Sequence, residues 1–188
     1  MAQHTAVHPL EIHTHRVGPD GTMAADGQFG LALTTLWHAV SLAGGAVGFV
    51  PSVARADVAA RAAAAVTELR AAKASGIALI ADRQLVGFGM LTAGTGLMSH
   101  TGEIAAVMVD PALQGTGLGG GLMTEILALA RLLGLERVSL SIRQGAGLDA
   151  FYARFGFVEC GRRPGWVRVA DGDDRDDIWL WLDLGQLR

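Results

Sequence analysis

The chain has few cysteines and few charged residues, and each shortage excludes a class of structure or partner. Its 188 residues include one cysteine, Cys160, so no disulfide can form within the chain. Charged residues make up 18%, and the net charge at pH 7 is -3. Without a basic surface, we expect no nucleic-acid partner. The lone thiol and an opening without a basic-then-apolar leader favour the reducing cytoplasm.

Charge is missing altogether from residues 27–54, a stretch long enough to span a membrane. Polar side chains interrupt this stretch, Gly44 and Gly45 break it, and Pro51 follows. Apolar residues recur at helical spacing from Phe29 to Val40. The sequence therefore predicts a buried amphipathic helix and no membrane partner.

Hydrophobic residues make up 51% of the chain, which suits one well-packed domain at this length. We expect residues 1–9 to form a flexible tail and residues 10–188 to form the domain. Segments with strand alternation and with helical periodicity are interleaved along that domain. This order predicts an α/β fold, with a central mixed, mostly antiparallel sheet flanked by about four helices. The acidic run 171–177 is interpreted as an exposed turn between the last two strands.

The segment from Asp110 to Gly121 joins a buried strand to a glycine-rich helix start. Pro111 cannot extend a central strand, so the chain must leave the sheet there. Glycines let a ligand approach the backbone closely, and the free N–H groups of the first helical turn suit an anion. We therefore expect this junction to bind phosphate groups.

A dinucleotide site is an alternative interpretation of the same glycines. The pattern Gly115-x-Gly117-x-x-Gly120 fits that fingerprint, and Glu136 follows at the spacing of the ribose-binding acid. However, five residues separate the strand from the glycines, and too little chain follows for a second half. An NAD-binding protein is therefore the less favoured alternative. A P-loop is excluded, because no Lys-Ser or Lys-Thr pair follows the glycines.

The spacing Gln114-x-x-Gly117-x-Gly119 resembles the acetyl-CoA signature of the GCN5-related N-acetyltransferases (GNAT). Residues 151–157, Phe-Tyr-Ala-Arg-Phe-Gly-Phe, resemble a second hallmark of that family. The resemblance implies an acyl-CoA-dependent N-acyltransferase that uses acetyl-CoA as co-substrate and no metal. It also implies that Tyr152 donates a proton to the departing CoA thiolate. The residues implied to bind the cofactor are Val107, Met108, Val109, Gln114, Gly115, Thr116, Gly117, Leu118, Gly119, Gly120 and Gly145.

Residues 44–49, 150–152 and 161–165 together resemble a narrower group, the tabtoxin-resistance type of small-molecule acetyltransferase. That resemblance implies Glu103 as a general base. It also places Ser141 in the acceptor pocket, at a position where those relatives carry an acid. Phe49 and Trp166 are further candidates to line this pocket, and Arg168 shares a strand face with Trp166.

We therefore predict transfer of acetyl from acetyl-CoA to a primary amine of a small molecule. The acceptor would be an amino-acid-like metabolite or antibiotic, in a self-resistance or biosynthetic role. A non-catalytic CoA-binding sensory domain is the main alternative. Trp179 and Trp181, on an apolar last strand, could form part of a homodimer surface.

Overall fold

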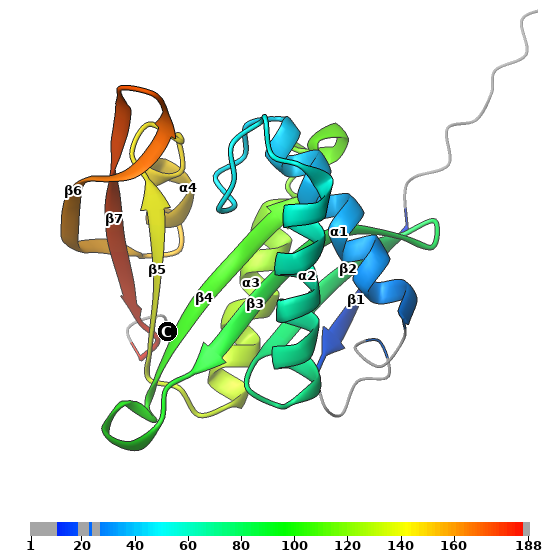
Figure 1. Cartoon of the computed structure of the whole chain (residues 1–188). Helices are drawn as coiled ribbons and strands as arrows, with labels where there is room; N and C mark the ends of the chain where they lie inside the picture. Colours follow the sequence, from blue (N-terminus) through cyan, green and yellow to red (C-terminus); the bar gives the residue numbers. More distant parts are fainter. Residues whose placement is uncertain (1–10, 19–22, 24–26, 186–188) are drawn as a thin grey trace, which may run out of the picture.

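The computed structural model describes residues 11–18, 23 and 27–185. Its seven-stranded sheet has the strand order β1-β2-β3-β4-β5-β7-β6. Helices α1 and α2 cover one face of the sheet, and α3 and α4 pack on the other (Figure 1). The elements are β1 (Ile12–Val17), α1 (Gly27–Leu42), α2 (Arg55–Arg70), β2 (Ser75–Ala81), β3 (Gln84–Ala93), η2 (Gly96–Met98), β4 (Thr101–Val109), η3 (Pro111–Leu113), α3 (Leu118–Leu132), β5 (Arg137–Arg143), α4 (Asp149–Ala153), β6 (Val158–Ala170) and β7 (Asp173–Asp183).

All neighbouring strands run antiparallel except β4 and β5, which are parallel. The predicted α/β fold, with a mixed sheet and four helices, is therefore confirmed. The predicted flexible tail, residues 1–9, lies outside the described residues.

The charge-free stretch forms α1 and the loop that follows it. One side of α1 is buried against the sheet through Phe29, Leu33 and Trp37, as the helical spacing predicts. Gly44, with φ of 83°, ends the helix, because its backbone N–H and that of Gly45 bond back to carbonyls of the last turn. Within the described ranges, no helix combines the length and apolar character needed to cross a bilayer.

Strands β4 and β5 separate after a short stretch of pairing. They pair only where Thr101 to Glu103 face Arg137 to Ser139. Ala106 in β4 has φ of 53°, and the register of β4 against β3 shifts beside it. Such a bulge bends a strand and increases its twist. The sheet is therefore split between β4 and β5 over the remaining length of β4, and Figure 1 shows the two strands diverging.

The acidic run 171–177 is not the exposed turn that the sequence predicted. Only residues 171–172 form the turn, and β7 begins at Asp173. The charges are accommodated because arginines on the same hairpin neutralise them. The ion pairs are Arg162 with Asp176, Arg163 with Asp177, Arg168 with Asp174 and Arg175 with Asp173. Strand β7 lies between β5 and β6, so its tryptophans are on a sheet face and not at a sheet edge.

Candidate active site

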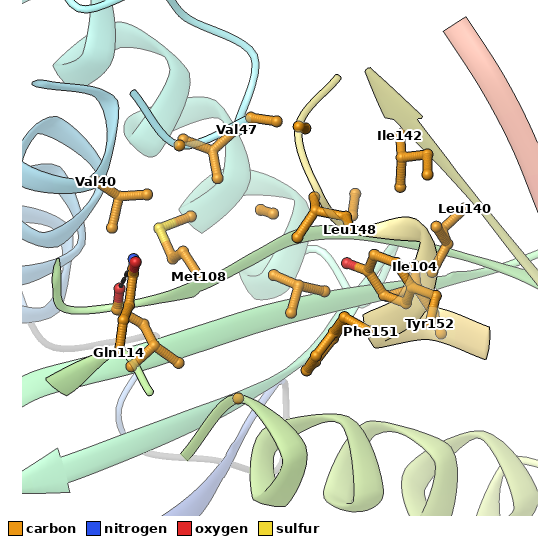
Figure 2. Close-up of a pocket in the computed structure, with 18 of the residues that line it drawn as sticks. Val40, Val47, Ile104, Met108, Gln114, Leu140, Ile142, Leu148, Phe151 and Tyr152 are labelled. Carbon is orange, nitrogen blue, oxygen red and sulfur yellow. Dashed lines mark hydrogen bonds between the residues drawn. The ribbon is translucent and has the colours of Figure 1, made fainter. Parts of the chain in front are cut away.

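The split between β4 and β5 opens a cavity of about 360 Å³ (Figure 2). Its walls come from four parts of the chain that lie far apart in sequence. They are the end of α1 with its following loop, the outer half of β4, the middle of β5, and α4. Gln114 and Gly119 close it at the start of α3.

The edge of β4 that faces β5 has no strand partner beyond Glu103 in the described structure. The residues from Ile104 to Val109 line the cavity along this edge. Their other edge pairs with β3, for example Met108 with Phe88. An unpaired strand edge offers N–H and C=O groups to an extended ligand that carries amides of its own. The predicted cofactor residues Val107, Met108 and Val109 therefore lie beside such a groove.

The glycine loop places the open end of α3 at this cavity. Gly117 precedes the helix with φ of 94°, and no side chain caps the helix there. The loop itself is fixed by local hydrogen bonds. Gln114 Nε2 donates to the Val109 carbonyl at 3.1 Å, and Thr116 Oγ1 donates to the Leu113 carbonyl at 2.7 Å. The N–H groups of the first turn of α3 are thus left for an anionic ligand, as a phosphate-binding turn requires.

Tyr152 is held by α4 on the opposite side of the cavity. Its ring contacts Phe151 and Phe157 edge to face, with centroids 4.9 and 5.7 Å away. Figure 2 shows its hydroxyl pointing into the cavity. Burial raises the pKa of Tyr152 to about 12. The phenol therefore keeps its proton at neutral pH and can serve as a proton donor.

Several predicted site residues do not line this cavity. Most of them belong to the glycine loop beside it or to the second cavity described below: Phe49, Gly115, Thr116, Gly117, Leu118 and Gly120. The other three, Glu103, Gly145 and Trp166, line neither cavity. Glu103 is exposed at the closed end of the split, where it pairs with Ser139, and the cavity lining begins at the next residue. Gly145 faces Arg175 Nη1, which would lie 3.1 Å from a Cβ at that position. Trp166 is 65% exposed and stacks on Arg163.

A second cavity of about 410 Å³ adjoins the first. The two share Ala46 and Ser141 as lining residues, so Ser141 lies at the junction between them. The loop after α1 supplies one wall, and β5, β6 and β7 supply the other. The lining residues are Ala46, Gly48, Phe49, Val50, Val53, Ser141, Arg143, Val167, Arg168, Val169 and Asp177.

Phe49 and Arg168, two of the residues predicted to line the acceptor pocket, thus line this second cavity. The loop that carries Phe49 is anchored, since Trp37 Nε1 donates to the Val47 carbonyl at 2.8 Å and the Phe49 ring packs against Trp37. Arg143 and Asp177 were missed by the sequence reasoning. Strand alternation could have found Arg143, which is two residues beyond Ser141 on the same face of β5.

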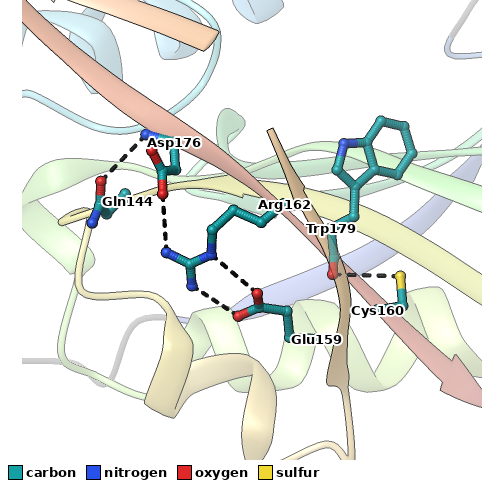
Figure 3. Close-up of polar contacts among 6 residues, drawn as sticks. All are labelled: Gln144, Glu159, Cys160, Arg162, Asp176 and Trp179. Carbon is teal, nitrogen blue, oxygen red and sulfur yellow. Dashed lines mark hydrogen bonds and ion pairs between the residues drawn. The ribbon is translucent and has the colours of Figure 1, made fainter. Parts of the chain in front are cut away.

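Ion pairs join neighbouring residues of the β6–β7 wall of this second cavity. Arg162 joins Glu159 to Asp176, and the Asp176 N–H is held by Gln144 Oε1 at 3.3 Å (Figure 3). The Gly165 N–H and then Arg162 lower the pKa of Asp176, and Arg162 also lowers that of Glu159. Both carboxyl groups therefore stay ionised at neutral pH and keep their ion pairs with Arg162.

Comparison with known proteins identifies the family. A model of the acetyltransferase (GNAT) family matches residues 48–157, more than half of the chain. The chain therefore belongs to the GNAT family, whose members are acyl-CoA-dependent N-acyltransferases. The matched range includes β4, the glycine loop and α4, which carry the site described above.

Individual relatives agree with this assignment. An amino-acid acetyltransferase of Mycobacterium tuberculosis is 38% identical over 108 residues, which are 56% of this chain and 58% of that protein. The match thus spans little more than half of the relative's length. A GNAT-family protein of Desulfovibrio desulfuricans superposes with a TM-score of 0.71 at 19% identity, covering 93% of this chain and 99% of that one. Salmonella typhimurium yncA, solved with its cofactor acetyl-CoA, gives 0.67 at 20%, covering 94% and 95%.

Proposed function

We propose that this protein transfers the acetyl group of acetyl-CoA to a primary amine of a small molecule. The observation that carries the proposal is the position of the Tyr152 hydroxyl, which points into a cavity bounded by the unpaired edge of β4. A thioester bound along β4 would lie between this proton donor and the second cavity. Acetyl-CoA supplies an acetyl group activated as a thioester.

The residues of the chain divide the work of the reaction. The first turn of α3, after Gly117, binds the pyrophosphate, and the backbone around Val107 binds the pantetheine amides and polarises the thioester carbonyl. The second cavity holds the acceptor, which must lose its ammonium proton before it can attack. Tyr152 then gives its proton to the sulfur that leaves. We further propose Glu103, acting through water, as the group that accepts the ammonium proton.

The amino-acid-like acceptor stays part of this proposal. It is supported by the similarity to an amino-acid acetyltransferase and by charged residues in the second cavity. A role in resistance to an amino-acid-like antibiotic, as in the tabtoxin-resistance type, rests on the sequence resemblance described above. We propose it as one use of the same chemistry.

Calorimetric titration with acetyl-CoA, with NAD as the control ligand, tests the cofactor assignment. We expect micromolar binding of acetyl-CoA and none of NAD, because the loop is built for a bent pyrophosphate beside an open strand edge. A panel of primary amines, assayed for released CoA, then tests transfer. Binding without release of CoA for any amine would support the non-catalytic sensory domain instead.

Replacing Glu103 with glutamine should lower kcat/KM for the acceptor and shift its rise to higher pH. The glutamine keeps the size of the side chain but cannot take a proton, so the acceptor must then lose its proton to solvent. The Kd of acetyl-CoA should stay unchanged, because Glu103 lies outside the cavity that β4 lines. An unaltered pH profile of kcat/KM would remove Glu103 from the mechanism.

A further inference from the structure

The second cavity is lined by one arginine and one aspartate that lie opposite each other on adjacent strands. Arg143 of β5 and Asp177 of β7 are directly paired in the sheet register, and both line the cavity. No ion pair joins them in the part of the chain that the structure describes. Each is instead oriented by other groups, which leaves part of its hydrogen-bonding capacity unused.

Asp177 is nearly buried, with a side chain 8% exposed. All its described hydrogen bonds fall on one oxygen: Oδ2 accepts from Arg163 Nε at 2.9 Å, from Arg163 Nη2, and from Trp179 Nε1 at 2.9 Å. Among the described residues, no donor lies on Oδ1. Because no fully buried side-chain polar atom in that same part of the chain lacks a partner, Oδ1 must be reached by solvent. This carboxylate oxygen faces solvent without a protein donor, so it is free to accept a hydrogen bond from a ligand.

Arg143 has donors to spare. Its described hydrogen bond runs from Nη2 to the Gly44 carbonyl at 3.3 Å, across to the loop after α1. A guanidinium carries five N–H donors, so most remain for a ligand. Arg168, on the same cavity, differs, because its Nε and Nη2 already bond both oxygens of Asp174 at 2.7 and 2.8 Å. Arg143 is therefore the cavity arginine best placed to bind a carboxylate.

We propose that the second cavity binds the α-amino and carboxylate groups of an amino acid. The amine that is acetylated is then a second amine, on the side chain of the same molecule. Asp177 Oδ1 accepts from the α-ammonium, and Arg143 donates to the carboxylate. An amine held by a carboxylate stays protonated and cannot attack a thioester, so the reacting nitrogen must be another. This inference rests on the proposed function and names its acceptor: a diamino monocarboxylic acid.

The distance of Arg143 from the junction of the two cavities suits such a molecule. Ser141, which lines both, precedes Arg143 by two residues, or about 7 Å along a strand. A side chain of three or four methylene groups covers that span. In the transfer, the C–N bond forms while the C–S bond breaks. The electron pair leaves with sulfur, which takes the Tyr152 proton. The nitrogen sheds its proton through water towards Glu103, and Tyr152 regains a proton from solvent before the next cycle.

A set of lysine analogues tests the assignment with acetyl-CoA saturating. L-Lysine and L-ornithine should show kcat/KM at least roughly tenfold above that of cadaverine, which lacks the carboxylate, and of ε-aminocaproate, which lacks the α-amine. The product from lysine should carry acetyl on the side-chain nitrogen by mass-spectrometric fragmentation. Equal kcat/KM across the set, or acetylation at the α-nitrogen, would overturn the inference while leaving amine acetylation intact.

Single substitutions test which residues bind the carboxylate and the α-ammonium group of lysine. Arg143→Gln should raise KM roughly tenfold for L-lysine and leave KM for cadaverine unchanged, because only lysine has a carboxylate that Arg143 can bind. Arg131→Gln, an exposed arginine on α3, is the matched control and should change neither. Asp177→Asn keeps the shape of the side chain and should weaken lysine in the same way.

A direct binding measurement separates this inference from the proposed function. Calorimetry of L-lysine into the CoA-bound protein reports recognition without any need for transfer. We expect binding that Arg143→Gln weakens roughly tenfold and Arg131→Gln does not alter. Absence of lysine and ornithine binding, or binding that Arg143→Gln leaves unchanged, would reject the site even if transfer to other amines is observed.

Discussion

Replacing Tyr152 with phenylalanine should lower kcat by about 10²- to 10⁴-fold, the usual contribution of a positioned proton donor. The phenyl ring keeps the packing against Phe151 and Phe157, so the fold and the cavity should survive. What is lost is the hydroxyl that points into the cavity. The Kd of acetyl-CoA, measured by calorimetry, should stay nearly unchanged, because the pyrophosphate and pantetheine contacts lie on α3 and β4. Unchanged turnover would exclude Tyr152 as the acid.

The ionisation of the Tyr152 hydroxyl can be measured directly. Tyr152 is the only tyrosine of the chain, so the ultraviolet absorbance of phenolate reports this residue alone. Burial raises its pKa to about 12, so the phenolate signal should appear well above the pH at which a free tyrosine ionises. The Tyr152→Phe protein supplies the blank. Since the raised pKa keeps the acid protonated, activity should rise with pH as the acceptor amine loses its proton, without an early fall on the alkaline side.

Replacing Gly117 with valine should abolish tight binding of acetyl-CoA. Gly117 has φ of 94°, in the left-handed region that a side chain enters at a cost of about 1–2 kcal/mol, and a β-branched side chain is least tolerant of it. To escape this strain, the loop must rotate the N–H groups of the first turn of α3 away from the phosphate position. We expect Kd to rise by at least about tenfold, measured by calorimetry.

The matched control for Gly117 lies four residues further on. Gly121 is inside α3, and a Cβ added there meets nothing within 4 Å. Gly121→Ala should therefore leave Kd unchanged and raise the thermal midpoint, because alanine favours the helix by about 1 kcal/mol over glycine. Equal Kd values for the Gly117→Val and Gly121→Ala proteins would show that the turn does not hold the cofactor.

The glycine turn and the tyrosine segment are predictable from sequence, because each is formed by residues that are close together in the chain. A glycine turn before an amphipathic helix, and a tyrosine four residues before a glycine, are set by residues close together in the chain. The family followed from these two segments, and the fold class followed from the order of strand and helix patterns along the chain. Both are confirmed, the fold by the structure and the family by the family match. The roles of Glu103 and Tyr152 stay predictions.

The parts that the sequence missed depend on pairing between distant residues. The sequence predicts Asp177 to be part of an exposed acidic turn, since nothing near it in sequence reveals Arg163, its partner on β6. Its alignment with Arg143 joins residues 34 positions apart and depends on the β5–β7 register. The split between β4 and β5 is likewise set by where their pairing stops, and the strained backbone at Ala106 has no signature in the residue type.

The split sheet also has a consequence for how the protein behaves between catalytic cycles. Beyond Glu103, β4 ends its pairing with β5, and its free edge is roofed by the loop after α1 and by α4. A long unpaired strand edge is a template on which another chain can add a strand. Acetyl-CoA bound along that edge would occupy it, in the position that a further strand of the sheet would take. Bound acetyl-CoA would thus keep this strand edge from pairing with another chain.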